Sequence, residues 1–391
     1  MKYWRGYLTA AILGAFTWVL IQMGQRYTTL VDMVYPYVTR SVQSFLTAWT
    51  GAVDFLVWQT AVVFLIIVLI ATLVLVFIFR AKVIRWLGWA LAAVVVMVML
   101  HTGIYGLNQY AGPIEEDLRL NMVDYTQSEL EAATIFYRDM AIGLSGKVAR
   151  DENGSILSSD FETLAQQTGN GYRNLARERS FSIFGGDYTP VKRLGWAGLY
   201  TAQGKTGVTV ALTGESAVNP EIPGYVQPFA MAHEMAHRLC IARDSEADFS
   251  AFLSCADNES VEYQYSGYFM AYKFCREALY SVDAAACDTI TAAVEGTPLA
   301  HDISELGDFF AANHDEALTS LVASVTDTVN EAASDETLRR STVCDYLVSW
   351  HIDQYVEEEV IEQKFDPFDE TQVDLSGLVN HKPQETEGSG E

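Results

Sequence analysis

The residues best suited to chemistry form the motif His233-Glu234-Met235-Ala236-His237. An α-helix turns by about 100° per residue, so side chains four residues apart project from one face. The two histidines are therefore expected to hold one zinc ion, with each nitrogen about 2.0–2.1 Å from the metal. Glu234 lies on the adjacent face, where a carboxylate can act as general base toward a water that the zinc activates. The motif predicts zinc-dependent hydrolysis, and two ordinary histidines on a helix are the competing interpretation.

An acidic segment follows the motif and reads Arg243-Asp244-Ser245-Glu246-Ala247-Asp248. A third protein ligand would leave one coordination position for water, as in catalytic zinc sites. Asp244 and Glu246 compete for that role, and we favour Glu246 slightly because its longer side chain suits a ligand from a neighbouring helix. Asp248 is expected to accept a hydrogen bond from an imidazole N–H and to orient that ring. A solvated charge on a helix is the alternative for Asp248.

Two tyrosines downstream of the acidic segment, Tyr265 and Tyr268, are candidate catalytic donors. Hydrolysis of a peptide bond develops negative charge on the carbonyl oxygen, and a tyrosine hydroxyl near the metal can stabilise that charge. Packing of the two rings in the core is the competing interpretation.

The elements that must position these residues are helices and one strand. Pro228 marks the start of the helix that carries the histidines. Residues 207–213 alternate apolar and polar side chains with period two, which predicts a strand. As an edge strand it could align an extended peptide substrate, and an ordinary sheet strand is equally compatible with the pattern. Earlier in the chain, Ser159-Asp160 should begin a helix that Gly169-Asn170-Gly171 interrupts.

The first 107 residues are much more apolar than the rest. They contain six of the 8 tryptophans, mostly near the ends of uncharged segments, as is typical of anchors at a membrane surface. We expect residues 25–54 to form an outer loop with an amphipathic helix at 39–50. Three segments are predicted to be transmembrane helices: residues 7–23, 55–79 and 86–107.

Charge is divided between the two parts of the chain. Residues 1–107 carry 7 Lys or Arg and 2 Asp or Glu, a net charge of +5, whereas the remainder has a net charge of −30. Such an acidic surface argues against nucleic acid as a partner and leaves the lipid bilayer and a peptide or protein substrate. Lys2, Arg5 and the basic cluster at 80–85 predict a cytoplasmic N-terminus, with residues 108–391 on the outer side.

The expected organisation is therefore a transmembrane region at 1–107, a domain at 108–372 and a disordered acidic tail at 373–391. The domain is expected to be α+β and mostly helical, with a small sheet. A capping box at Thr126 and Glu129 predicts one of its helices.

Four motifs occur in order along the chain, and together they carry a resemblance. They are Thr213-Gly214-Glu215-Ser216-Ala217-Val218-Asn219, His233 to His237, Asp244 to Phe249, and Tyr265-Ser266-Gly267-Tyr268. With Tyr35-Pro36-Tyr37 and the three apolar segments, this arrangement resembles a bacterial family of membrane-anchored zinc metallopeptidase-like proteins whose shared domain has no assigned function. The resemblance covers most of residues 1–360. It implies a zincin-like domain, bound Zn²⁺ and peptidase machinery.

The acidic motif of that family typically reads Glu-x-Glu-Ala-Asn-Phe, and here Asp244 replaces the first Glu and Asp248 the Asn. In the gluzincin pattern a Glu ligand precedes an orienting Asp by four residues. Counted back from Asp248, that rule selects Asp244, so the third ligand stays open between Asp244 and Glu246. A glycine that the family has three residues after the second histidine is Cys240 here. The chain also resembles, more distantly, membrane peptidases that cleave prenylated or misfolded proteins, and intracellular antirepressor peptidases.

These observations favour a membrane-tethered zinc endopeptidase with Glu234 as its general base. One alternative is a peptidase-like binding or sensor module without turnover, and another is a membrane scaffold in which zinc is structural. A closed site, in which both acids or Cys240 join the histidines, would favour structural zinc. An open site would favour the enzyme.

Overall fold

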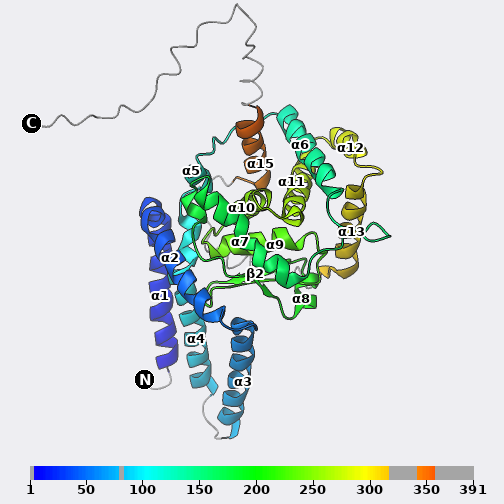
Figure 1. Cartoon of the computed structure of the whole chain (residues 1–391). Helices are drawn as coiled ribbons and strands as arrows, with labels where there is room; N and C mark the ends of the chain where they lie inside the picture. The colour runs from blue at the N-terminus through cyan, green and yellow to red at the C-terminus, as the bar shows by residue number, and fades with distance from the viewer. Residues whose placement is uncertain (1–3, 79–82, 317–340, 357–391) are drawn as a thin grey trace, which may run out of the picture.

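The computed structural model describes residues 4–78, 83–316 and 341–356 (Figure 1). It is mostly helical with one small three-stranded sheet, so the predicted fold class is confirmed. The predicted tail at 373–391 and the end of the predicted domain, 357–372, lie outside the described residues.

Three helices of 22 residues each are long and apolar enough to cross a membrane: α1 (Arg5–Arg26), α3 (Val57–Ile78) and α4 (Val83–Ile104). Their ends differ by a few residues from the predicted segments. α1 packs along α4, and Gly6 and Gly88 meet where the two backbones touch. A Cβ on Gly6 would lie 2.4 Å from the carbonyl carbon of Gly88, so this crossing requires a small residue.

The segment predicted as an outer loop is instead one long helix, α2 (Thr28–Thr50). It runs without a break through Pro36, which ordinarily costs a helix about 3 kcal/mol. Contacts with the rest of the chain offset that cost. Tyr35 donates a hydrogen bond of 2.8 Å to the Thr102 carbonyl, and Asp32 accepts one of 2.8 Å from the Gly112 N–H. Gln43, further along, donates to the Ala211 carbonyl at 3.0 Å.

The rest of the described chain forms a domain with one main hydrophobic core. Its helices are η1 (Gly106–Tyr110), α5 (Ile114–Leu118), α6 (Gln127–Ser145), α7 (Phe161–Arg177), η2 (Ser182–Phe184), α8 (Ala197–Ala202), α9 (Gln227–Arg238), α10 (Asp244–Ala256), α11 (Val261–Val282), α12 (Ala284–Ala292), α13 (Pro298–Asn313), α15 (Val343–His351) and η3 (Ile352–Val356). Thr126 and Glu129 form the predicted capping box at the start of α6.

α7 begins after its cap Asp160 as predicted, but no interruption occurs at Gly169 and Gly171. The two glycines serve packing instead of breaking the helix. A Cβ on Gly171 would lie 1.8 Å from the Ser254 carbonyl oxygen of α10, and one on Gly169 would lie 2.5 Å from Tyr188 Cβ. Close approach of the neighbouring chain therefore explains these glycines.

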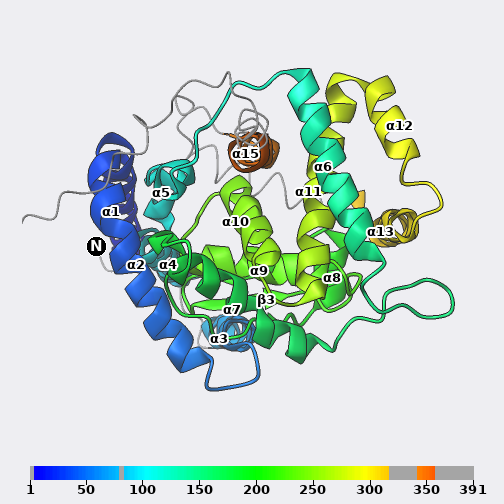
Figure 2. The same ribbon diagram turned by 45° about the horizontal axis from the view of Figure 1, so that its top comes forward.

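The sheet contains β1 (Lys192–Arg193), β2 (Gly207–Val210) and β3 (Glu215–Val218) in the order β1-β3-β2. β2 pairs antiparallel with β3, with Thr209 opposite Ser216, and forms one edge of the sheet. The predicted strand at 207–213 is thus real but ends at Val210. The sheet lies under α9, and α7, α10 and α11 surround that helix (Figure 2).

Candidate metal centre

α9 presents His233 and His237 from one face, one turn apart. Their Nε2 atoms lie 3.1 Å from each other, and the two rings are at 88°. Two ligand atoms that bind one zinc ion tetrahedrally at about 2.0–2.1 Å lie roughly 3.3 Å apart. The spacing of the two nitrogens therefore fits a shared metal ion.

The other nitrogen of each ring already has a partner. His233 Nδ1 lies 2.7 Å from Asp248 Oδ1, and His237 Nδ1 lies 2.8 Å from the Ile241 carbonyl oxygen. A carbonyl oxygen only accepts hydrogen bonds, so His237 carries its proton on Nδ1, and a carboxylate favours the same tautomer of His233. When both rings are neutral, the two Nε2 lone pairs face each other. A shared cation would remove that repulsion.

The charges around the two rings also favour a cation. Burial lowers the pKa of His233, but the hydrogen bond and charge of Asp248, with the charges of Glu234 and Asp244, outweigh burial and raise the pKa to about 9. The interaction with His237, above all, lowers the pKa of Asp244. A metal ion would take the place of the extra proton that this environment attracts.

Asp244 completes the group of possible ligands. Its Oδ1 atom lies 3.3 Å from His237 Nε2, and the ligand atoms of His233, His237 and Asp244 all lie within 4.8 Å of one another. The Asp244 side chain is 87% exposed, so this side of the group is open to solvent.

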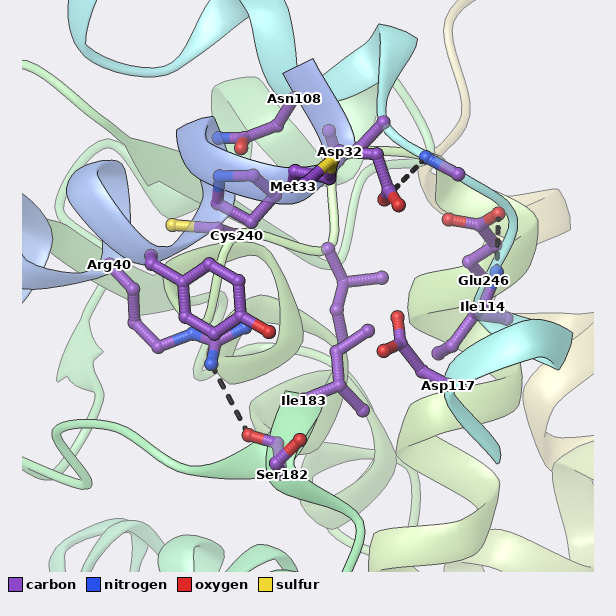
Figure 3. Close-up of a pocket in the computed structure, with 16 residues that line it drawn as sticks. Asp32, Met33, Arg40, Asn108, Ile114, Asp117, Ser182, Ile183, Cys240 and Glu246 are labelled. Atoms are coloured by element: carbon purple, nitrogen blue, oxygen red, sulfur yellow. Dashed lines mark hydrogen bonds between the residues drawn. The ribbon is translucent and has the colours of Figure 1, made fainter. Parts of the chain in front are cut away.

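Glu246, which the sequence favoured slightly as third ligand, does not join the histidines. Residues two apart on a helix point about 200° away from each other, so Glu246 faces the opposite side of α10 from Asp244. Its carboxylate pairs with Arg243 and accepts a 3.4 Å hydrogen bond from the Ile114 N–H. There it lines a cavity of about 300 Å³ between α2, α5 and the loop after α9 (Figure 3).

Cys240 lines the same cavity (Figure 3). Its thiol is 3.5 Å from the Thr39 hydroxyl of α2. The Cys240 backbone has a φ of 73°, in the left-handed region, which costs a residue with a Cβ about 1–2 kcal/mol. That conformation explains why a glycine suits this turn. Among the described residues, the group at the histidines therefore contains neither Cys240 nor Glu246.

Glu234 lies on the sheet side of α9 and is buried. The Thr209 hydroxyl of β2 is 2.7 Å from Glu234 Oε2, and the Ser216 hydroxyl of β3 donates to the Glu234 carbonyl at 2.9 Å. A Cβ on Gly207 would lie 2.6 Å from Glu234 Cγ and from Oε1, so the carboxylate fits against β2 only because position 207 is glycine. The edge strand thus fixes the position of the predicted general base.

A comparison with family models adds one finding. Residues 31–333 match the model of a family described as "Protein of unknown function (DUF3810)". The chain belongs to the DUF3810 family. No curated protein and no solved structure matched the chain. The DUF3810 match begins within α2 and includes all three residues of the metal-ligand group.

Within the DUF3810 region the structure buries both predicted catalytic tyrosines in the core. The Tyr265 hydroxyl donates to the carboxylate of Asp302, which also forms a 2.7 Å ion pair with Arg150. The Tyr268 ring packs edge-on against Phe252, with ring centres 5.5 Å apart. These contacts agree with the competing interpretation, in which the two tyrosines pack in the core.

The charge of Glu234 contributes to a raised pKa at two other tyrosines. Burial raises the pKa of Tyr105, as do the charges of Cys240, Glu234 and Asp244. Burial and the charge of Glu234 likewise raise the pKa of Tyr200. Both hydroxyls therefore keep their protons at neutral pH, as hydrogen-bond donors must. Nothing in the sequence motifs marks either residue: Tyr105 directly follows α4, and Tyr200 lies on α8.

Proposed function

We propose that this DUF3810 protein is a membrane-tethered, zinc-dependent endopeptidase. The observation that carries the proposal is the pair of Nε2 atoms 3.1 Å apart, with each Nδ1 held by an acceptor and Asp244 beside them. Three protein ligands suit a catalytic site, which keeps one position for water, better than a closed structural site. Glu234 next to this group supports an enzyme further, since a structural site has no use for a positioned carboxylate.

Bound zinc would supply a Lewis acid that polarises the scissile carbonyl and makes water acidic enough to react. The chain supplies the remaining steps. Glu234, held by Thr209, takes the proton from the attacking water and delivers it to the leaving amine. Asp248 keeps His233 in the tautomer whose Nε2 faces the ligand position. Tyr105 and Tyr200, whose pKa values respond to the charge of Glu234, are the candidates we propose for donating a hydrogen bond to the carbonyl oxygen as negative charge develops on it.

The orientation in the membrane is part of the same proposal. The start of α1 and the end of α3 lie at one end of the molecule, remote from the domain (Figure 1). Lys2 and Arg5 flank the first of these points, and the basic residues at 80–85 flank the second. Because short cationic segments stay in the cytoplasm, the domain is expected on the outer side of the cytoplasmic membrane.

Zinc content and peptide cleavage, measured together on the full-length chain, test the proposal. We expect one zinc per chain in both the native protein and Glu234→Gln, and cleavage of an unbiased peptide library by the native protein alone. Zinc without cleavage in either protein would indicate a peptidase-like binding module. Absence of zinc from both would refute the metal site.

A further inference from the structure

The start of α3 is joined to the general base through two adjacent residues of β3. Glu215 is buried and accepts hydrogen bonds of 2.9 Å from the N–H groups of both Val57 and Trp58. Ser216, the next residue, donates to the Glu234 carbonyl at 2.9 Å. The path along these bonds, from the Trp58 nitrogen through Glu215 and Ser216 to the backbone of Glu234, is at most about 20 Å long. Since α3 is a candidate membrane span, its first turn marks the bilayer surface.

The end of α4 reaches the same site from another direction. Tyr105 directly follows α4, and the charges of Glu234 and Asp244 add to burial in raising the pKa of its hydroxyl. Hydrogen bonds hold this segment in place. Asn108 accepts one from Thr39 at 3.1 Å, and the same hydroxyl is 3.5 Å from Cys240 Sγ in the loop that follows the second histidine. Hydrogen bonds therefore link the start of α3 to α9, and the segment after α4 to the loop that follows α9.

Two large apolar side chains are exposed close to the start of α3. On α8 and its N-cap, Trp196 and Leu199 are 46% and 49% exposed. The Trp196 ring packs edge-on against Trp58 of α3, with ring centres 5.9 Å apart. Exposed tryptophan next to a membrane span is typical of the interface between lipid and water. Tyr200, the residue after Leu199, feels the charge of Glu234, so one short helix connects the expected lipid surface with the site.

We propose that the substrate is a polypeptide anchored in the same membrane and cut within about ten residues of its membrane segment. The inference rests on the proposed peptidase function and on α3 and α4 crossing the bilayer. An extended chain advances about 3.3 Å per residue, so some six residues span 20 Å from the bilayer surface to Glu234. The edge of β2 would pair with this extended segment. Confinement of enzyme and substrate to one membrane would also raise their effective concentration.

Full-length protein reconstituted with zinc in phosphatidylcholine–phosphatidylglycerol vesicles tests the inference. Three substrates share one randomised 12-residue segment, which lies on the same side of the membrane as the domain. The segment is fused directly to a transmembrane helix, separated from that helix by a 40-residue Gly-Ser spacer, or supplied as a free peptide. We expect at least tenfold higher kcat/KM for the direct fusion, with Glu234→Gln inactive on it.

The other outcomes separate the two proposals. Equal cleavage of the free peptide would overturn the membrane-anchored substrate and leave the peptidase proposal intact. Equal cleavage of the spacer fusion would overturn the cut next to the membrane. If the zinc-loaded protein cleaves none of the three substrates, the peptidase proposal fails, and the inference fails with it.

Discussion

The side of the domain next to α3 and the side next to α6 and α11 are built from different contacts. Near α3, buried polar groups join strands to helices: Glu215 holds two N–H groups of α3 and pairs with Lys192 at 2.8 Å. On the remote side, aromatic rings pack together, as Tyr137 does with Phe252 at 5.4 Å. The remote side also has a buried carboxylate, Asp302, which pairs with Arg150, but near α3 the buried polar groups hold the strands beside Glu234 in position. We therefore assign chemistry to the first side and stability to the second.

Apart from changes to the metal ligands and to Glu234 itself, the largest effect is expected from Gly207→Ala, next to the site. The new methyl group would lie 2.6 Å from the Glu234 side chain and would displace it. Because a shift of about 1 Å can cost a hundredfold in rate, kcat for peptide cleavage should fall about 100-fold with zinc content unchanged.

Gly143→Ala in α6 is the matched control, since a Cβ there meets nothing within 4 Å. It should keep full activity and raise the unfolding free energy by about 0.5–1 kcal/mol, as alanine does in a helix. Similar losses of kcat in both variants would contradict the role given to β2.

Asp248→Asn should weaken zinc binding roughly 30-fold, because partners of ligand histidines typically contribute 10–100-fold in affinity. It should also change the pH dependence of the metal-free protein. Asp248 helps to raise the pKa of His233 to about 9, so its stabilising effect is complete below about pH 6.5 and is lost as pH rises through 9. If the melting temperatures of the metal-free variant and of the metal-free native protein depend on pH in the same way, Asp248 does not stabilise the charged form of His233.

Tyr105→Phe should lower kcat about tenfold with little change in zinc content. This fall is smaller than that caused by losing a sole oxyanion donor, because Tyr200 remains. Tyr265→Phe is the control on the remote side. It removes a hydrogen bond to buried Asp302, so it should cost about 1–3 kcal/mol of stability but leave kcat unchanged. Rate assays and thermal melts check both variants. A lower kcat in Tyr265→Phe, with kcat unchanged in Tyr105→Phe, would show that Tyr265 is the catalytic residue.

The smallest effect is expected from Leu199→Glu, which places a charge on the surface facing the bilayer. Cleavage of a membrane-anchored peptide should fall by up to about threefold to fivefold, since a charged side chain near the interface costs at most about 1 kcal/mol. Val282→Glu, at a residue that is 62% exposed at the end of α11 remote from α3, should not change cleavage. Equal rates for the two variants would argue against contact of α8 with lipid.

Local sequence signals predicted the local structure well. The Thr126–Glu129 capping box and the cap Asp160 lie where the pattern placed them, because both depend on contacts within one helical turn. The spacing of His233 and His237 likewise determines their common face. Even the third residue of the group follows from helix geometry: Asp244 and Asp248 are four apart and share a face, whereas Glu246 lies opposite them. Helix periodicity, and not side-chain length, therefore decides which acid lies beside the histidines.

The remaining errors required knowledge of distant contacts. Pro36 and the pair Gly169 and Gly171 favour breaks, yet α2 and α7 continue because other segments pack on them. Proximity in sequence suggested Tyr265 and Tyr268, whereas Tyr105 and Tyr200 come near Glu234 only through tertiary packing.

The most direct test of the metal centre compares zinc affinity in the native protein, Asp244→Ala and Glu246→Gln by competition with a chelator. Loss of a ligand should weaken binding at least about 100-fold in Asp244→Ala, more than the loss of an outer partner. Glu246→Gln should bind zinc within about threefold of the native affinity and lose stability, because Arg243 is left without its buried partner. A large loss of affinity in Glu246→Gln and none in Asp244→Ala would contradict the account.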